Sequence, residues 1–324
     1  MNSKQYVLSV LEANRGQVVS GSKLAKELSL SRNAVWKAIK GLKEEGYAID
    51  AVTNKGYSLS SENDILSSQS IEPYLGKCKD SLRIEVHKTI TSTNTVMKEL
   101  AAQGELEGKV IIAQEQTEGR GRLGRSFYSP PAGIYLSILL RPKMAIEDSL
   151  FITTTAAVAV AKAIESVSTC VAKIKWVNDI FCNGKKVCGI LTEAGIDFES
   201  QILDYAVVGI GINVDYPKDG FPEELKEVAT SIFEKNLYST NARSQLVAEV
   251  LNNFWGYYEG TSMKSCIQEY RKRSFLIGKE IDVILGNESK KAVALEVDDN
   301  ARLVVQFTDG EIKTLHSGEV SVRV

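Results

Sequence analysis

The spacing of apolar residues in the first sixty positions predicts three short helices followed by two strands. The helices are predicted over residues 4–12, around residues 24–28 and over residues 32–45, and the strands over residues 47–52 and 56–59. Ser20 or Ser22 is placed to cap the second helix, and Ser31 to cap the third. This order predicts a helix-turn-helix with a β-hairpin wing, whose turn is formed by Thr53, Asn54 and Lys55.

The third predicted helix has an apolar face and a basic face. Val35, Ile39 and Leu42 recur at i, i+4 and i+7, so we expect them to face the core. Four residues that point outward from this helix are candidates for contacts to DNA bases: Arg32, Asn33, Trp36 and Lys37. Lys40 of the same helix and Lys55 of the wing are candidates for contacts to phosphates.

Charge along the chain supports this interpretation. Residues 1–60 hold nine Lys/Arg and five Asp/Glu, whereas the remaining 264 residues hold 30 and 36. A basic end on an acidic body is typical of a nucleic-acid-binding module attached to another domain. The alternative is a helical docking or dimerisation module with a solvated basic face.

After a polar segment at residues 61–69, interpreted as a linker, the pattern changes to strands and longer helices. Helices are predicted over residues 95–103 and 150–167, and strands over residues 83–89, 109–116, 134–140, 172–176, 180–182, 186–194 and 205–214. We expect antiparallel hairpins with helices on one face, which is an α+β domain. Short β runs end the chain, at residues 280–285, 291–297, 303–307, 311–315 and 320–324.

Composition describes an ordinary globular protein of 324 residues, long enough for two or three domains. The N-terminus lacks a charged-then-apolar leader, and the apolar run at 150–167 contains Lys162 and Glu165, so we expect a buried helix and a cytoplasmic protein. The five cysteines include no CxxC pair, which favours reduced thiols over a disulfide framework or a zinc site. The chain has only two histidines, which does not favour catalysis or metal binding by histidine.

The clearest candidate for chemistry is a loop of alternating glycine and arginine at residues 119–125, between two predicted strands. Glycine allows the main chain to approach a ligand closely, and the arginine guanidinium matches phosphate or carboxylate. The loop is therefore interpreted as a mobile segment that closes over an anion. A solvated basic turn or a nucleic-acid patch is the alternative.

Further polar and glycine positions in the same domain favour an anion pocket. Lys186 begins an alternating strand in which Gly189 leaves room for a ligand against the sheet, and residues 209–213 read Gly-Ile-Gly-Ile-Asn. Residues 92–94, Ser-Thr-Asn, stand before a predicted helix and are interpreted either as a simple N-cap or as part of this pocket. No P-loop, Rossmann fingerprint or serine-hydrolase elbow is present.

These motifs, in this order after a winged helix, resemble the bifunctional biotin–protein ligase and biotin-operon repressor family over nearly the whole chain. The residues that carry the resemblance are Ser92-Thr93-Asn94, Gly119 to Arg122, Lys175-Trp176 with Asn178-Asp179, Lys186 with Gly189-Ile190-Leu191, and Gly209 to Asn213. The resemblance implies a winged helix-turn-helix at 1–62, a mixed-sheet, class II synthetase-like α+β ligase domain at 63–270, and an SH3-like β-barrel at 271–324.

The resemblance also implies a reaction in which biotin and ATP, with Mg²⁺, give biotinyl-5′-AMP. A lysine of a biotin carboxyl carrier protein then takes the biotin. Lys186, Arg120 and Asp179 are the implied catalytic residues, with Lys186 placed against the α-phosphate and the biotin carboxylate. Biotin binding is implied for Ser92, Thr93, Asn94, Gln116, Gly119, Arg120, Gly121, Arg122, Lys186 and Gly189. ATP or adenylate binding is implied for Arg122, Arg125, Phe127, Asn178 and Asn213, with Mg²⁺ near Asn213 and no protein-only metal site.

Two residues depart from the family pattern. Val177 stands where proline is frequent, and Phe127 stands where a tryptophan that stacks on adenine is frequent, so weaker adenine contact is expected. Asp179 is interpreted either as orienting a lysine or as a buried structural carboxylate. In the regulatory hypothesis, adenylate orders the glycine–arginine loop, favours a homodimer and places two winged helices on operator DNA.

Three other functions remain open from sequence. They are a non-catalytic repressor that senses biotin, a lipoate or octanoate ligase with a regulatory head, and a ligase whose winged helix only docks partners. Lipoate ligases carry an arginine-glycine-histidine pattern that is absent here.

Overall fold

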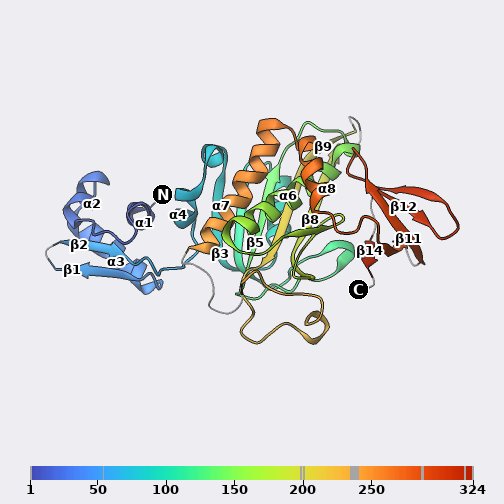
Figure 1. Ribbon diagram of the computed structural model, residues 1–324. Helices are drawn as coiled ribbons and strands as arrows, with labels where there is room; N and C mark the ends of the chain where they lie inside the picture. The colour runs from blue at the N-terminus through green and yellow to red at the C-terminus, as the bar shows by residue number, and fades with distance from the viewer. Residues whose placement is uncertain are drawn as a thin grey trace. The chain divides into compact units, whose positions relative to one another are not determined.

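The computed structural model describes residues 2–53, 55–197, 199, 201–233, 241–285, 288–316 and 319–322 (Figure 1). Its contacts divide the chain into two compact units. The first comprises the described residues of Met1–Gly76 and Tyr238–Ala248, and the second those of Lys77–Leu237 and Glu249–Val324.

Three helices and a two-stranded antiparallel sheet begin the first unit: α1 (Ser3–Ala13), α2 (Gly21–Glu27), α3 (Arg32–Glu44), β1 (Ile49–Val52) and β2 (Gly56–Leu59). Ser20, rather than Ser22, caps α2 by accepting a hydrogen bond from the Lys23 N–H, and Ser31 caps α3 through the Ala34 N–H. The predicted core residues of α3, Val35, Ile39 and Leu42, are buried. Asn54, in the predicted wing turn, lies outside the described residues.

The polar segment at residues 61–69 differs from the linker that we expected. The main-chain N–H of Ala48 donates to Asn63 Oδ1, and Ser67 and Ser70 cap the short helix α4 (Ser68–Ile71) reciprocally. Asn63, Ser67 and Ser70 are all buried. These hydrogen bonds pair Asn63 Oδ1 and the hydroxyls of Ser67 and Ser70 inside the first unit, so a polar composition here does not mean exposure.

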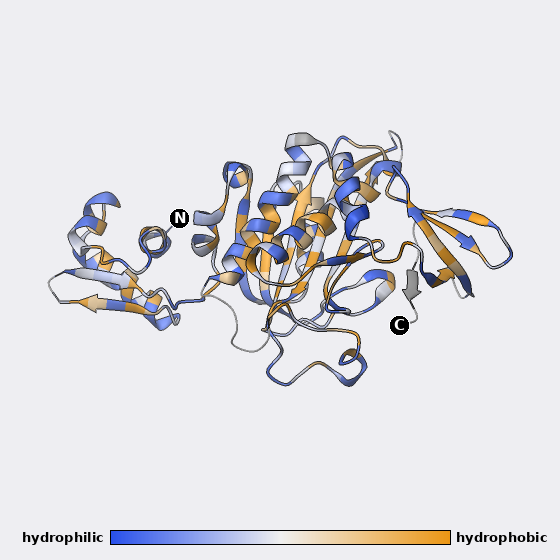
Figure 2. Ribbon diagram, in the orientation of Figure 1, coloured by the Kyte–Doolittle hydropathy of each residue, from blue (hydrophilic) through white to orange (hydrophobic). Residues whose placement is uncertain are grey.

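A seven-stranded mixed sheet forms the second unit, with strand order β3-β4-β5-β9-β8-β7-β6 (Figure 1). The strands are β3 (Arg83–Ile90), β4 (Lys109–Gln116), β5 (Gly133–Leu140), β6 (Lys173–Lys175), β7 (Asp179–Cys182), β8 (Lys185–Asp197) and β9 (Ile202–Asn213). Strands β3 and β4 are parallel and are joined through α5 (Thr93–Ala102), whereas the other neighbouring pairs are antiparallel. Figure 2 shows hydrophobic residues concentrated in this sheet and in the helices packed on it.

The helices do not all lie on one face of this sheet, so that expectation was wrong. Met97 of α5 packs with Leu139 and Val207. Thr153 of α6 (Leu150–Val167) hydrogen-bonds to Thr192, a neighbour of Val208. Because successive side chains of a strand point to opposite faces, α5 and α6 cover opposite faces of the sheet. The parallel β3–α5–β4 crossover, which the sequence analysis did not identify, accounts for the helix on the second face.

Helix α6 is the one stretch of the described residues that is long and apolar enough to cross a membrane, as part of Ile146–Val167. Most of its residues are buried, so it is a core helix, as predicted. The remaining helices are α7 (Ala242–Trp255), which continues from the first unit into the second, and α8 (Ile267–Arg273).

A five-stranded antiparallel sheet ends the chain, in the order β13-β12-β11-β10-β14. Its strands are β10 (Glu280–Leu285), β11 (Glu288–Val297), β12 (Leu303–Phe307), β13 (Ile312–Leu315) and β14 (Glu319–Val322), and residues 323–324 of the last predicted run lie outside the described residues. Trp176 Nε1 donates to the Ala301 carbonyl at 3.0 Å, and the Phe181 and Phe275 rings are 5.3 Å apart. These contacts join the small sheet to the β6–β7 edge of the large one.

A partly buried ion pair lies beside β6, between α6 and the end of α8. Arg273, at the end of α8, donates to Glu165 of α6 at 2.7 Å and lies 2.9 Å from Glu269. Burial raises the pKa of Glu165, but the hydrogen bonds from Arg273 and from the Ala172 main chain outweigh it and leave that pKa below its ordinary value.

We predict that Glu165→Gln lowers the free energy of unfolding by on the order of 1 kcal/mol at neutral pH, because the charge-assisted bond from Arg273 is lost. A lowered pKa in the folded state stabilises the protein above the ordinary value of 4.5. The difference between the two proteins should therefore shrink as the pH falls below that value. Denaturant unfolding at several pH values measures it, with exposed Glu224→Gln as control. A difference that is independent of pH would contradict the prediction.

Candidate functional site

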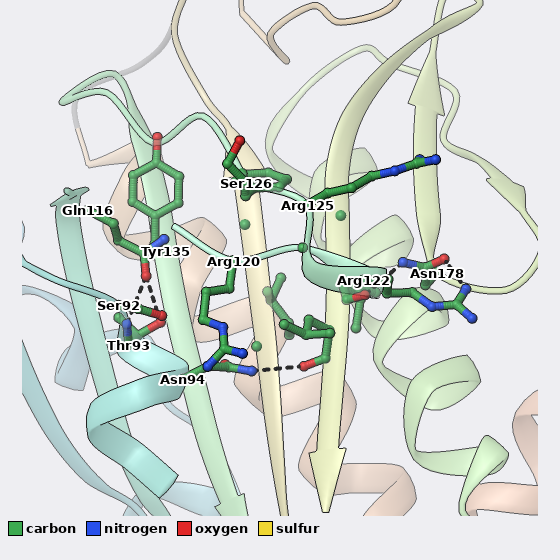
Figure 3. Close-up of a pocket in the computed structure, with 18 of the residues that line it drawn as sticks. Ser92, Thr93, Asn94, Gln116, Arg120, Arg122, Arg125, Ser126, Tyr135 and Asn178 are labelled. Atoms are coloured by element: carbon green, nitrogen blue, oxygen red, sulfur yellow. Dashed lines mark hydrogen bonds between the residues drawn. The ribbon is translucent and has the colours of Figure 1, made fainter. Parts of the chain in front are cut away.

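A cavity opens on the α5 face of the large sheet, beneath the glycine–arginine loop (Figure 3). It is lined from α5 and its N-cap, from β4, β8 and β9, and from the loop itself. The lining residues include Ser92, Thr93, Asn94, Gln116, Arg120, Gly121, Arg122, Arg125, Phe127, Asn178, Asp179, Lys186 and Gly189, all of them predicted from sequence.

Glycines on β8 and β9 form the floor of this cavity. Gly189 and Gly211 are directly paired across the two strands. A Cβ atom at Gly211 would lie 2.5 Å from the Phe127 ring, and one at Gly189 would lie 2.9 Å from it. A Cβ atom at Gly209 would lie 2.1 Å from Asn94 Oδ1. The missing side chains therefore allow an aromatic ring and an amide to lie directly on the sheet.

One end of the cavity is polar and buried. The main-chain N–H and the hydroxyl of Thr93 both donate to Gln116 Oε1, at 2.8 and 3.1 Å. Ser137, inside the otherwise apolar strand β5, shares its hydroxyl hydrogen between Thr93 Oγ1 at 2.8 Å and Asn94 Oδ1 at 2.6 Å. Ser92 caps α5, so both interpretations of the Ser-Thr-Asn segment apply: its first residue is an N-cap and all three line the cavity.

A carboxylate that sequence reasoning missed organises the side chains beside this end. Glu193 of β8 accepts hydrogen bonds from Lys98 at 2.7 Å and Asn94 at 3.0 Å, and lies 3.9 Å from Arg120. Burial raises the pKa of Glu193, but the bonds from Lys98 and Asn94 and the nearby positive charges outweigh this, so that pKa is lowered. Glu193 therefore remains ionised at neutral pH and holds the positive charges in place. Figure 3 shows Arg120 directed toward Asn94.

Lys186 is fixed by both its side chain and its main chain. Its Nζ lies 2.7 Å from Asp179 Oδ1, and both side chains are partly exposed to the cavity. Its N–H donates to the Val228 carbonyl at 2.8 Å, and its carbonyl accepts from Thr230 at 2.9 Å. The segment 228–230 thus lies along the start of β8. Asp179 contacts a lysine, which is one of the two roles considered for it.

The loop forms a narrow turn whose arginines spread over the cavity. Gly121 N–H donates to the Arg125 carbonyl at 2.7 Å, and Phe127 N–H donates to the Gly119 carbonyl at 2.8 Å. Arg122 reaches Asn178 at 3.1 Å (Figure 3). The peptide bond after Trp176, which precedes Val177, is cis.

A second, larger cavity lies between the β6–β7–β8 edge and the start of the small sheet. Besides Lys186, three lysines give it a basic lining: Lys173, Lys175 and Lys279. Arg125, Ser126, Phe127, Asp179 and Lys186 line both cavities, so they form a shared wall. The two cavities can therefore hold the two parts of one reaction on either side of Lys186.

Two predicted site residues do not line the first cavity. Gly119 does not line the first cavity, and Asn213 lines the second one, where its amide donates to the Thr230 carbonyl at 3.0 Å. Sequence reasoning missed Ser137, Glu193 and the lysine set of the second cavity. A polar residue inside an apolar strand was the available signal for Ser137; nothing in the sequence pairs Glu193 with Arg120.

The residues predicted to contact DNA lie in the first unit. Arg32, Asn33, Trp36, Lys37 and Lys40 are exposed along one side of α3, and Lys55, which precedes β2, is also exposed. The Trp36 ring is 52% exposed, with Lys40 Nζ 5.8 Å from its centre. An exposed tryptophan among basic residues is unusual for a solvated face and suits a binding surface.

Known families and structures match this arrangement. An HTH domain model matches residues 4–58, the Biotin/lipoate A/B protein ligase family matches residues 86–213, and the Biotin protein ligase C terminal domain matches residues 276–323. A biotin protein ligase from Aquifex aeolicus, solved in complex with biotin and ATP, superposes with a TM-score of 0.60 at 28% identity, covering 74% of this chain and 98% of that one. Fold and site thus define the class of biotin and lipoate protein ligases.

Relatives that match this chain over almost its whole length identify its family within this class. The bifunctional ligase/repressor BirA of Bacillus spizizenii is 34% identical over 313 residues, 94% of each chain. The protein of the same name from Escherichia coli is 27% identical over 334 residues, covering 99% of this chain and 98% of its own. The chain belongs to the BirA family of bifunctional ligase/repressors.

We predict that Gly211→Ala displaces the Phe127 ring from the sheet and destabilises the fold by roughly 1–3 kcal/mol, because the added methyl group overpacks the site. Gly256→Ala is the control, since a Cβ atom there meets nothing within 4 Å. Denaturant unfolding and a crystal structure of the variant measure the effect. Equal stability of the two variants, with Phe127 unmoved, would contradict it.

Proposed function

We propose that this protein is a biotin–protein ligase that also represses transcription of biotin genes. The observation that carries the proposal is the placement of Lys186 in the wall between a cavity with a buried polar end and a basic cavity. Support comes from relatives named as ligase/repressors and from the likeness to a ligase solved with biotin and ATP. This geometry suits a reaction that joins a carboxylate to a phosphate.

The reaction has two steps. A carboxylate oxygen of biotin attacks the α-phosphorus of ATP, pyrophosphate leaves, and the mixed anhydride biotinyl-5′-AMP forms. The ε-amine of a lysine on a biotin carboxyl carrier protein then attacks the anhydride carbonyl, loses a proton and releases AMP. Neither step needs a nucleophile from the protein, so catalysis consists of positioning and of charge stabilisation.

Lys186 supplies the central positive charge. Its ammonium neutralises repulsion between the biotin carboxylate and the α-phosphate and stabilises the charge that grows on the phosphate oxygens. Asp179 holds Lys186 in the wall at 2.7 Å. Arg120, Arg122 and Arg125 close with the loop over the joined groups, each offering a fork of donors to phosphate or carboxylate oxygens.

Biotin occupies the first cavity. Its ureido ring lies at the polar end, near Ser92, Thr93, Asn94 and Gln116, and its tail runs past the Phe127 ring, which covers Gly189, toward Lys186. The main chain of the loop around Gly121 covers it. An apolar slot with a few convergent polar groups is the usual form of a small-molecule site.

ATP occupies the second cavity. The adenine stacks on Phe127 and Asn213 contacts the nucleotide from the second cavity, while Asn178 reaches it from the first. Among the described residues, no group of three His, Cys, Asp or Glu side chains is placed to hold a metal ion. In this proposal Mg²⁺ would be held largely by the phosphate oxygens of ATP. The amide oxygen of Asn213 is a ligand type that Mg²⁺ accepts, and the bound ion neutralises phosphate charge.

The ends of the chain complete the function. We infer a winged helix-turn-helix at residues 1–62, in which β1 and β2 form the wing, and an SH3-like barrel at residues 271–324 after a synthetase-like domain. Helix α3 enters the major groove, and Lys40 and Lys55 contact phosphates. Biotinyl-AMP orders the loop and favours a homodimer that presents two such helices to operator DNA.

We predict that Lys186→Ala lowers transfer of labelled biotin to a carboxyl-carrier domain at least 100-fold, because the developing charge loses its partner. Lys185→Ala is the control: its ammonium bonds to the Lys226 carbonyl, and it lines neither cavity. Tight biotin binding without any labelling by the unaltered protein would favour a biotin-sensing repressor instead. Tighter binding of lipoate than of biotin would favour a lipoate ligase.

We predict that the protein shifts the DNA upstream of its own regulon more strongly when biotin and ATP are present. Lys40→Ala should weaken this binding and reduce the slope of log affinity against log salt by about 1, because one phosphate contact is lost. Lys43→Ala, on the same helix, is the control. An affinity for DNA that is the same with and without biotin and ATP would refute the link between adenylate formation and DNA binding.

A further inference from the structure

A chain of hydrogen bonds runs from the interior of the sheet to the end of the glycine–arginine loop. Ser137 Oγ lies 2.8 Å from Thr93 Oγ1, and Thr93 donates twice to Gln116 Oε1. Gln116 Nε2 donates to Ser129 Oγ at 3.0 Å, and Ser129 Oγ donates to the Phe127 carbonyl at 2.9 Å. Ser129 is only 5% exposed, so these bonds are made away from water.

Which atom donates and which accepts in this series of hydrogen bonds is fixed by the Thr93 N–H beside Gln116. The main-chain N–H of Thr93 can only donate, so the atom facing it must be the amide oxygen of Gln116. The amide nitrogen then faces Ser129, whose oxygen must accept. The single hydroxyl hydrogen of Ser129 is consequently left for the Phe127 carbonyl.

This arrangement decides what Gln116 presents to the cavity. Its amide oxygen is occupied by two donors and one amide hydrogen is occupied by Ser129, so the second amide hydrogen is the group left for a ligand. Beside it, Ser92 Oγ accepts from Thr95 N–H, which leaves the Ser92 hydroxyl hydrogen for donation. The polar end of the cavity therefore offers donors, and it suits an acceptor oxygen on the ligand.

We propose that Ser129 is a positioning residue that holds the Gln116 amide with an N–H toward the ligand, and so selects a head group with a carbonyl oxygen. The inference rests on the proposed function and deepens it, because the ureido oxygen of biotin is such an acceptor. The dithiolane ring of lipoate offers no comparable oxygen. Ser129 thus contributes to substrate choice through Gln116.

The same series of hydrogen bonds explains why residue 119 is glycine, although this residue does not line the cavity. A Cβ atom there would lie 2.3 Å from the Phe127 carbonyl oxygen and 2.4 Å from Ser129 Oγ, the two ends of one hydrogen bond. It would also lie 3.3 Å from Gln116 Nε2. Any side chain at 119 would break the hydrogen bond from Ser129 to the Phe127 carbonyl, which ends this series of bonds.

The test compares Ser129→Ala with Ser231→Ala in the full chain. Ser231 is a matched control, because its hydroxyl also donates to a carbonyl two residues away, that of Phe233, at 2.8 Å, but serves no side-chain amide. We expect Ser129→Ala to raise the Kd and KM for biotin about tenfold, the equivalent of one hydrogen bond, with kcat within about twofold. Its preference for biotin over 2-iminobiotin, in which an imino group replaces the ureido oxygen, should fall. Ser231→Ala should change none of these values.

Ser129→Cys is a second variant for the case that Ser129→Ala does not fold. Its thiol has nearly the shape of the hydroxyl but is a weak hydrogen-bond acceptor and donor. It should move affinity and preference in the same direction. Unchanged biotin affinity and preference in both Ser129 variants would overturn the inference, as would a loss confined to kcat. The unaltered protein separates the two proposals: if it fails to bind biotin, the proposed function itself is wrong.

Discussion

The site depends on bare main chain in the middle of a sheet. Where β8 and β9 pair, Gly189, Gly209 and Gly211 leave the α5 face without side chains, and Phe127 and Asn94 occupy the space. A strand interior normally gains its stability from packed side chains, so three glycines weaken it locally. The surrounding core compensates: β5 is buried along its whole length and α6 covers the opposite face. A rigid scaffold can carry such a gap because its other face is fully packed.

Much of this could be predicted from the sequence because the responsible forces are local. Helix caps at Ser20 and Ser31, the i, i+4, i+7 spacing on α3 and the residues of β4 are all set by neighbours along the chain. The glycine–arginine loop and Lys186 were recognisable because alternating glycines and arginines, with a lysine at the start of a glycine-containing strand, suit an anionic ligand. The structure brings these residues into one cavity.

What could not be predicted depends on contacts between distant segments. The parallel pairing of β3 with β4, and with it the second helical layer, is decided by tertiary packing. The Glu193–Arg120 pair joins residues 73 positions apart, and both would be ordinary surface charges in isolation. Polar composition at residues 61–69 suggested a linker because the pattern does not reveal that Asn63 and Ser67 are buried and hydrogen-bonded. Gly119 was placed in the cavity, although its contacts are with Phe127 and Ser129.

The wall shared by the two cavities has a consequence for how long the reaction product stays bound. In the proposed reaction, biotin and ATP lie on the two sides of Phe127 and Lys186 before the first step, and each can leave independently. In the joined product, one half can leave its cavity while the other half stays bound. The bound half keeps the free half close to its own cavity, so the free half rebinds at a high effective concentration. Linked occupancy of this kind raises affinity over either half alone by about 10²–10⁴ without any new contact. With this placement, the shared wall favours retention of the reactive anhydride in the site until an acceptor lysine arrives.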